Sequence, residues 1–289
     1  MSGPYAPRVT DLPIPLVTPE WLAVHLGEPG LKVVDSRWAL DASGRAAFAE
    51  AHIPGAVYVD ADDDLAAPPV GPGGRHPLPA PVAFAAAMSA AGIGDQEAVV
   101  VYDVVQGSHA VRLWWMLTVT GHVAGVLDGG LQAWDGPIAH GARRPEPAVF
   151  TARAWPEDAL AGADQVAQGL SDGSAVVLDA RAPERYRGEV EPIDAKAGHV
   201  PGAVSAPWSG NLDPATGRFL PPEVLAERFE GLGARGGESS IVQCGSGITA
   251  LHDALAMRIA GLPMPRLYVG SWSDWISDPH RPVATGEQP

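Results

Sequence analysis

The chain has 289 residues, 46% of them hydrophobic and 18% charged, and this length and balance predict a globular protein of about two domains. Its 19 basic and 34 acidic residues give a net charge of −15, which argues against nucleic acid or an anionic membrane as a partner. We find no apolar run long enough to span a bilayer and no signal-peptide pattern, so we expect a cytoplasmic protein without a membrane anchor. The single cysteine, Cys244, excludes an intrachain disulfide and a multi-cysteine metal site.

Short β-branched runs alternate with helical patterns along the first half of the chain. Residues 31–35, 98–102 and 125–127 are almost continuously apolar, which is typical of buried parallel strands. Residues 81–91 and 109–120 carry apolar side chains at helical spacing and are predicted as helices.

The second half shows the same alternation. Strands are predicted at 175–179, 239–243 and 266–269, and helices at 222–232 and 249–260. Alternating strands and helices predict an α/β fold in which a mostly parallel sheet has helices on both faces. In such folds the active site lies beyond the carboxyl ends of the strands.

Four motifs of the first half recur in the second half in the same order, roughly 145 residues later. Examples are VVDSR at 33–37 with VLDAR at 177–181, and HIPGA at 52–56 with HVPGA at 199–203. A period this long predicts two copies of one domain. We place the copies at residues 1–140 and 157–289, joined by a linker at 141–156.

The sequence around Cys244 predicts a reactive site. An apolar strand ends at the cysteine, Gly245 and Gly247 let the loop N–H groups turn inward, and a helix begins near Thr249. The N–H groups and the positive end of the helix dipole favour an anion. A thiol in such a loop should ionise below its free value of about 8.5 and act as a nucleophile. The alternative is a buried cysteine without chemistry, which the loop context disfavours.

The first copy carries Asp103 at the position that matches Cys244. A carboxylate there would repel anions and cannot carry sulfur. We therefore expect the first copy to be catalytically silent.

Over essentially its whole length the chain resembles the two-domain rhodanese-type sulfurtransferases. The resemblance is carried by the paired His-x-Pro-Gly-Ala motifs, the Cys244 loop and the Gly-Ser-Trp-Ser-Asp-Trp segment at 270–275. It implies that Cys244 accepts a sulfane sulfur as a persulfide and passes it to cyanide or to a thiol, thioredoxin among the candidates. It also implies a silent N-terminal copy with aspartate in place of the cysteine, and it calls for no cofactor beyond the covalent persulfide.

The donor is expected to be 3-mercaptopyruvate. The loop from Cys244 through Gly245, Ser246, Gly247 and Ile248 to Thr249 has no Lys or Arg, and it is similar to the loop of mercaptopyruvate enzymes rather than to the basic loop of thiosulfate enzymes. Its residues Gly245, Gly247, Ile248 and Thr249 are expected to contact the donor.

Arg185 resembles the arginine that binds the donor's carboxylate in mercaptopyruvate enzymes. Those enzymes usually carry a second arginine about nine residues further on, where this chain has Ile193 or Asp194. The resemblance therefore implies a weaker grip on the carboxylate. Arg187 could compensate, but on an extended segment its side chain should face away from that of Arg185.

Three residues resemble positions proposed to assist proton transfer in the family: Ser246, His76 and Asp62. The alternatives are a serine that satisfies its own turn, and a polar cleft histidine with no chemical role. His52 and His199 recur in both copies, although only one copy has the cysteine, so we expect them to be structural. The acidic run at 60–64 lacks the spacing of a calcium loop and is predicted to be a solvated loop.

Other functions stay open to different degrees. A cysteine-based phosphatase would need an arginine six residues after the cysteine, where this chain has Ala250. A thiosulfate-preferring sulfurtransferase would differ only in donor kinetics. A redox-sensing or interaction module built on one reactive thiol is the non-enzymatic alternative.

Overall fold

The computed structural model describes residues 12–39, 43–69, 71, 73–142 and 145–289. The chain forms two compact units. Unit 1 comprises Met1–Leu65 and Pro79–Trp155, and unit 2 comprises Ala66–Leu78 and Pro156–Pro289. Residues 66–78 therefore pack with the second half of the chain although they belong to the first half by number. The sequence repeat gave no sign of this exchange.

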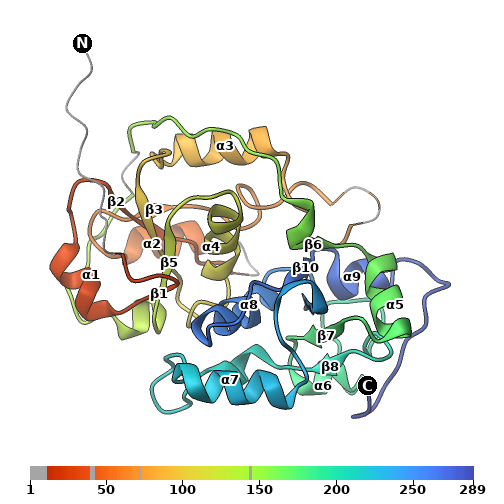
Figure 1. Ribbon diagram of the computed structural model, residues 1–289. Helices are drawn as coiled ribbons and strands as arrows, with labels where there is room; N and C mark the ends of the chain where they lie inside the picture. The colour runs from red at the N-terminus through yellow and green to blue at the C-terminus, as the bar shows by residue number, and fades with distance from the viewer. Residues whose placement is uncertain (1–11, 40–42, 70, 72, 143–144) are drawn as a thin grey trace. The chain divides into compact units, whose positions relative to one another are not determined.

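Unit 1 is built on a five-stranded sheet in which every strand pair is parallel (Figure 1). The strand order is β1-β5-β4-β2-β3. The strands are β1 (Leu16–Val17), β2 (Leu31–Asp35), β3 (Val57–Tyr58), β4 (Ala98–Tyr102) and β5 (Ala124–Leu127). The predicted strands at 31–35 and 98–102 are confirmed at both ends. The strands β1 and β3 were missed because two residues are too few to show a hydrophobic period.

Helices cover this sheet and complete the core of unit 1. They are α1 (Pro19–His25), α2 (Gly44–Glu50), α3 (Pro81–Ala90) and α4 (Ala110–Val119), with a 3-10 turn η1 (Gly130–Ala133). Val33 and Val100 of the sheet pack with Leu22 and Phe48 in one apolar cluster. The helix α4 is buried along almost its full length. The predicted helices at 81–91 and 109–120 are confirmed within one residue at each end.

Unit 2 repeats this architecture, again with every strand pair parallel. The strand order is β6-β10-β9-β7-β8, which matches that of unit 1 position by position. The strands are β6 (Leu160–Ala161), β7 (Val176–Asp179), β8 (Val204–Ser205), β9 (Ser240–Gln243) and β10 (Arg266–Tyr268). The helices are α5 (Ala163–Asp172), α6 (Pro183–Tyr186), α7 (Pro222–Gly231), α8 (Ala250–Ile259) and α9 (Ser271–Trp275), with 3-10 turns η2 (Glu157–Ala159), η3 (Trp208–Asn211) and η4 (Gly237–Ser239).

The register of the central strands decides which loops meet in unit 2. Asp179 at the end of β7 pairs with Gln243 at the end of β9. Because parallel strands end at the same edge of a sheet, the residues that follow them share that edge. Cys244 directly follows β9, so it lies beside the loop that follows β7.

Within the described part of the chain, no helix is both long and apolar enough to cross a membrane.

Candidate active site

Cys244 is buried in a cradle of hydrogen-bond donors at the carboxyl end of β9. The backbone N–H of Gly247 donates to its Sγ atom across 3.2 Å. Burial alone would raise the pKa of the thiol, but the Thr249 hydroxyl and the N–H groups of Ser246, Ala250 and Gly247 donate to the sulfur and outweigh it. The net effect lowers the pKa of Cys244, which favours the nucleophilic thiolate.

The cradle depends on the backbone shape that Gly247 allows. Its φ is +79°, and a Cβ atom at this position would lie 2.4 Å from the carbonyl oxygen of Val269. Any side chain would therefore push the loop away from the segment that follows β10. Thr249 then starts α8, so the N-terminal end of that helix faces the sulfur.

The segment after β10 supports the loop from behind. The N–H of Cys244 donates to Ser271 Oγ across 3.1 Å, and this hydroxyl donates to the carbonyl of Tyr268. Ser271 adopts a left-handed conformation with φ of +52°. The N–H of Trp272 donates to the carbonyl of Cys244. The sequence had pointed to 270–275 as a family motif, but it did not reveal that Ser271 bonds to the cysteine backbone.

Three arginines and three carboxylates lie near the thiol. We call them the arginine cluster, and its members are Arg75, Arg181, Arg185, Asp179, Glu191 and Asp194. Arg181 donates to both oxygens of Asp179, with a shortest distance of 2.7 Å, and contacts Glu191 at 3.5 Å. Burial lowers the pKa of Arg75, and the negative charge of a Cys244 thiolate opposes this shift. Burial also acts to lower the pKa of Arg181, but the negative charges of Asp179, Glu191 and the thiolate raise it overall. The cluster therefore places nearly balanced charge beside the Cys244 loop.

Arg185, which we expect to bind the donor, lies beside Gly245 of the Cys244 loop. A Cβ atom built on Gly245 would lie 3.5 Å from its Nη2 atom. Its guanidinium donates to both oxygens of Glu191, at 2.7 and 3.1 Å, and to Asp194 at 3.1 Å. The charge of Arg185 is thus held beside the Cys244 loop.

Arg187 does not join this cluster. Its guanidinium donates to both oxygens of the exposed Glu189 at 2.8 Å. The expectation that it faces away from Arg185 agrees with these contacts, but the expected extended geometry was wrong. Pro183–Tyr186 is a helical turn, in which residues two apart also point to different sides.

Arg75 is a site residue that sequence reasoning missed. It belongs to the segment 66–78 of unit 2, and its Nη2 atom would lie 3.0 Å from a Cβ atom on Gly245. Its Nη1 atom pairs with Asp194. The position of Asp194, expected to mark a missing arginine, therefore holds a carboxylate that contacts two arginines.

The three residues considered for proton transfer belong to two different units. Ser246 is buried within the Cys244 loop, and His76 is half-buried next to Arg75 in unit 2. Asp62 belongs to unit 1, where it is exposed and accepts a hydrogen bond of 2.8 Å from the indole of Trp38. Their assignment to proton transfer stays a prediction.

The two motif histidines make matching contacts in the two units. His52 Nδ1 lies 2.8 Å from the carbonyl of Phe48, and its ring stacks on that phenylalanine at 4.1 Å. His199 Nδ1 lies 2.8 Å from the carbonyl of Tyr186 and its ring stacks on that tyrosine at 3.8 Å. Both contacts fit the expected structural role.

In the loop of unit 1 that matches the Cys244 loop, the backbone N–H groups donate to a carboxylate of the same loop. Asp103 is fully buried. Its Oδ1 atom accepts from the N–H groups of Val105 and Gly107, and its Oδ2 atom from those of His109 and Ala110, at 2.8 to 3.0 Å. The loop of unit 1 thus also directs its N–H groups at an anion, which is a carboxylate of the chain itself.

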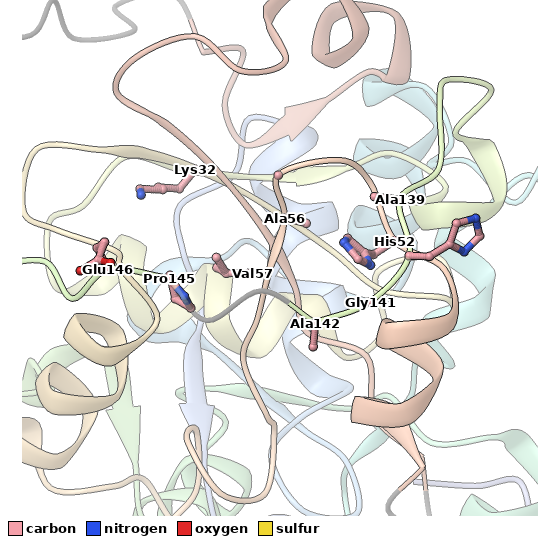
Figure 2. A pocket seen from close by; sticks show the side chains of 11 residues that line it. Lys32, His52, Ala56, Val57, Ala139, Gly141, Ala142, Pro145 and Glu146 are labelled. Atoms are coloured by element: carbon pink, nitrogen blue, oxygen red, sulfur yellow. The ribbon is translucent and has the colours of Figure 1, made fainter.

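Unit 1 also holds a pocket of about 590 Å³ (Figure 2). Lys32, His52 and His140 are among the residues that line it. Both histidines bond through Nδ1 to backbone carbonyls, of Phe48 and Glu50. These contacts fix the two histidine rings in the polar wall of the pocket.

The arrangement has no described metal centre. Among residues 12–39, 43–69, 71, 73–142 and 145–289, no group of three or more His, Cys, Asp or Glu side chains is placed to hold a metal ion. In the acidic run, Asp60 Oδ1 accepts from the N–H of Asp62 and Asp64 Oδ2 accepts from the N–H of Asp60, so these carboxylates bind the loop backbone.

Comparison with known proteins identifies related chains over most of the length. The rhodanese-like domain family matches residues 18–136 and 162–278. A relative from Pseudomonas aeruginosa, described as a probable 3-mercaptopyruvate sulfurtransferase, is 45% identical over 94% of this chain and 98% of its own. The thiosulfate sulfurtransferase of Bos taurus is 34% identical over 90% of this chain and 91% of its own.

A solved structure supports the same relationship. The 3-mercaptopyruvate sulfotransferase SseA of Escherichia coli has a TM-score of 0.78 and 32% identity, and the match covers 89% of this chain and 98% of that one. The relatives thus carry the names of two donors, and the overall similarity does not choose between them.

Proposed function

This chain belongs to the tandem rhodanese-like sulfurtransferases, and we propose that it moves a sulfane sulfur from 3-mercaptopyruvate to a thiol or cyanide through a persulfide on Cys244. The observation that supports Cys244 as the nucleophile is its cradle of N–H and O–H donors, which lowers the pKa of the thiol. No cofactor other than the persulfide takes part in this reaction.

The first half-reaction transfers sulfur to the enzyme. The Cys244 thiolate attacks the sulfur of 3-mercaptopyruvate, an S–S bond forms, and the C–S bond breaks. The electron pair of that bond leaves as the enolate of pyruvate, which takes up a proton. Arg185 orients the donor by its carboxylate, and the loop N–H groups of Gly245, Gly247, Ile248 and Thr249 stabilise the negative charge. Ser246, His76 and Asp62 are candidates for supplying the proton.

The second half-reaction restores the thiol. An acceptor thiolate or cyanide attacks the outer sulfur of the persulfide, and the S–S electron pair returns to Cys244 as thiolate. A reduced protein thiol such as thioredoxin would suit this step, and we place the reaction in the cytoplasm, where thiols are kept reduced.

The neutral loop supports 3-mercaptopyruvate over thiosulfate as the donor. The six residues from Cys244 to Thr249 include no cation, whereas a dianion such as thiosulfate is better matched by basic residues inside the loop. A thiosulfate preference is the second candidate, because relatives with that name match the chain almost as completely.

We assign catalysis to the second copy, residues 157–289, and a silent role to the first, residues 1–140, with 141–156 as the linker. Segment 66–78 is the exception, since it contributes Arg75 to unit 2. Asp103 already fills the loop of the first copy, which supports its silence.

The donor is tested by measuring kcat/KM for 3-mercaptopyruvate and for thiosulfate with one common acceptor. The proposal predicts a clear preference for 3-mercaptopyruvate, and a preference for thiosulfate would contradict it. Cys244→Ser should abolish turnover with both donors. If the protein forms a persulfide but never passes its sulfur on, the non-enzymatic redox-sensing alternative would replace the proposal.

A further inference from the structure

Two guanidinium groups from distant parts of the chain border the same glycine of the Cys244 loop. Measured from a Cβ atom built on Gly245, Arg75 Nη2 lies at 3.0 Å and Arg185 Nη2 at 3.5 Å. Arg185 comes from α6, and Arg75 comes from the segment 66–78. Both therefore border the residue that directly follows Cys244 in the chain.

Hydrogen bonds to side chains of α9 fix the backbone of the Arg75 segment. The N–H of Gly73 donates to Asp274 Oδ1 at 2.7 Å, and the N–H of Arg75 donates to Ser273 Oγ at 3.1 Å. The N–H of Ser273 in turn donates to the carbonyl of Gly245. Arg75 is thereby tied through one residue to the backbone of the loop that it borders.

The approach of this segment also requires Gly74. Its φ is +79°, and a Cβ atom there would lie 2.3 Å from the carbonyl oxygen of Gly270. This close packing fixes the backbone of Arg75 beside the Cys244 loop.

Asp194 joins the two guanidiniums. One carboxylate oxygen pairs with Arg75 Nη1, and the other lies 3.1 Å from Arg185 Nη2. The Asp194 side chain is only 4% exposed. A carboxylate held between two arginine forks is the arrangement that a 2-keto acid would itself need.

The charges of the cluster also bear on which donor fits. Arg75, Arg181 and Arg185 face Asp179, Glu191 and Asp194, so three positive charges meet three negative ones. The thiolate of Cys244 adds one more negative charge. Arg185 keeps its two bonds to Glu191, so an incoming anion can contact Arg75 Nη1 and Arg185 Nη2 together only if it takes the place of Asp194.

We propose that Arg75 is the second donor-binding arginine of this enzyme, and that Asp194 occupies the two guanidiniums until the donor's carboxylate displaces it. The identity of the donor rests on the proposed function, but the anion site itself does not. While Asp194 stays in place it disfavours a dianion more than a monoanion, so it also contributes to donor selection.

Alkylation of Cys244 tests the anion site without any sulfur transfer. Cys244 is the only cysteine, so the rates with anionic iodoacetate and neutral iodoacetamide report on this one position. We expect Arg75→Gln to lower the iodoacetate-to-iodoacetamide rate ratio about tenfold. Asp194→Asn should raise the ratio several-fold, and the matched control Arg187→Gln should leave it unchanged.

The reaction with neutral iodoacetamide also reports on folding. A variant with an intact Cys244 loop should react with iodoacetamide at a rate close to that of wild type. Arg75→Lys keeps the charge but loses the fork, and it should fall between wild type and Arg75→Gln. An unchanged ratio in Arg75→Gln would overturn the role of Arg75. A lower ratio in Asp194→Asn would overturn displacement of the carboxylate.

Donor kinetics separate this inference from the proposed function. Arg75→Gln should raise KM for 3-mercaptopyruvate about tenfold with a smaller change in kcat. Asp194→Asn should raise kcat/KM for thiosulfate by a larger factor than for 3-mercaptopyruvate. If wild type does not turn over 3-mercaptopyruvate while the alkylation ratio still depends on Arg75, the proposed function fails and the anion site stands. If wild type turns it over and Arg75→Gln has an unchanged KM, the inference fails alone.

Discussion

The Asp103 loop of unit 1 and the Cys244 loop of unit 2 follow matching strands of matching sheets, and both surround a buried atom with backbone N–H donors. In unit 1 those donors end on a carboxylate of the chain itself. In unit 2 they donate to the sulfur of Cys244, the residue that we propose as the sulfur carrier. The same arrangement of backbone donors therefore binds a structural carboxylate in one copy and lowers the pKa of a thiol in the other.

The surroundings of the two loops differ in a related way. Each unit has a buried Asp-x-Arg ion pair at the end of one strand. Asp35 at the end of β2 pairs with Arg37, and Asp179 at the end of β7 pairs with Arg181. In unit 2 the pair extends through Glu191 to Arg185. A structural ion pair common to both copies has thus become the base of a charged site in one of them.

Converting the second loop into the first should give the largest effect. Cys244→Asp places the residue of the silent copy in the catalytic loop, and turnover should fall by at least about 10³-fold because the nucleophile is gone. The measurement is steady-state sulfur transfer, with thermal unfolding as the control for an intact fold. Turnover within tenfold of wild type would show that the loops do not differ in the way described.

Removing the anion of unit 1 should cost stability instead. Asp103→Ala leaves four N–H groups, buried or partly buried, without their acceptor, and we expect a loss of about 3 to 5 kcal/mol in the free energy of unfolding. Cys244→Ala should cost about 2 kcal/mol less than this, because a thiol accepts weaker hydrogen bonds. Urea unfolding of both variants measures the difference. Equal losses would mean that the carboxylate has no special structural role.

A buried acid in unit 2 provides a pH-dependent test. Burial raises the pKa of Asp253 in α8 to about 7, against the opposing effects of Asn211 and Arg228. The folded state therefore binds a proton that the unfolded state, with a pKa of about 3.9, has already lost. This group's stabilising contribution is complete below pH 4 and is lost as the pH rises toward and through 7.

Asp253→Asn removes that dependence. Relative to wild type, the variant should gain on the order of 2 to 3 kcal/mol of stability between pH 5 and pH 7. Asn211 can still donate to an amide oxygen at this position, so packing is kept. Urea unfolding at several pH values checks the result. A constant difference between variant and wild type would show that Asp253 does not titrate in this range.

The smallest effect should come from one donor of the cradle. Thr249→Val removes the hydroxyl bond to the sulfur and should raise the pKa of the Cys244 thiol. We expect iodoacetamide to react a few-fold more slowly at neutral pH, with the rate profile moved toward higher pH. Thr249→Ser keeps the hydroxyl and should behave like wild type. An unchanged profile in Thr249→Val would contradict the role of this bond.

The central strands and main helices were predictable from the sequence because their patterns are strong. The apolar runs of β2 and β4 predict buried parallel strands. The succession of a strand, Cys244 and a helix is also recognisable from a few residues of sequence. The edge strands β1, β3, β6 and β8 have two residues each, too few to carry a pattern.

The charged half of the site was only partly predictable. Arg185 was found through its family segment, but Arg75 lies 119 residues before its partner Asp194, and no local pattern links them. The absence of a second arginine near Asp194 suggested a weaker site. The fold instead brings an arginine from another segment to the same place, which sequence spacing cannot show.

The most direct test of the account is to trap the sulfur itself. Wild-type protein is treated with 3-mercaptopyruvate in the absence of an acceptor, and its mass is measured before and after addition of cyanide. We predict a gain of one sulfur atom, located at Cys244 after digestion and lost on adding cyanide. A protein that gains no sulfur, or that gains it in Cys244→Ser as well, would contradict the assignment of Cys244 as the sulfur carrier.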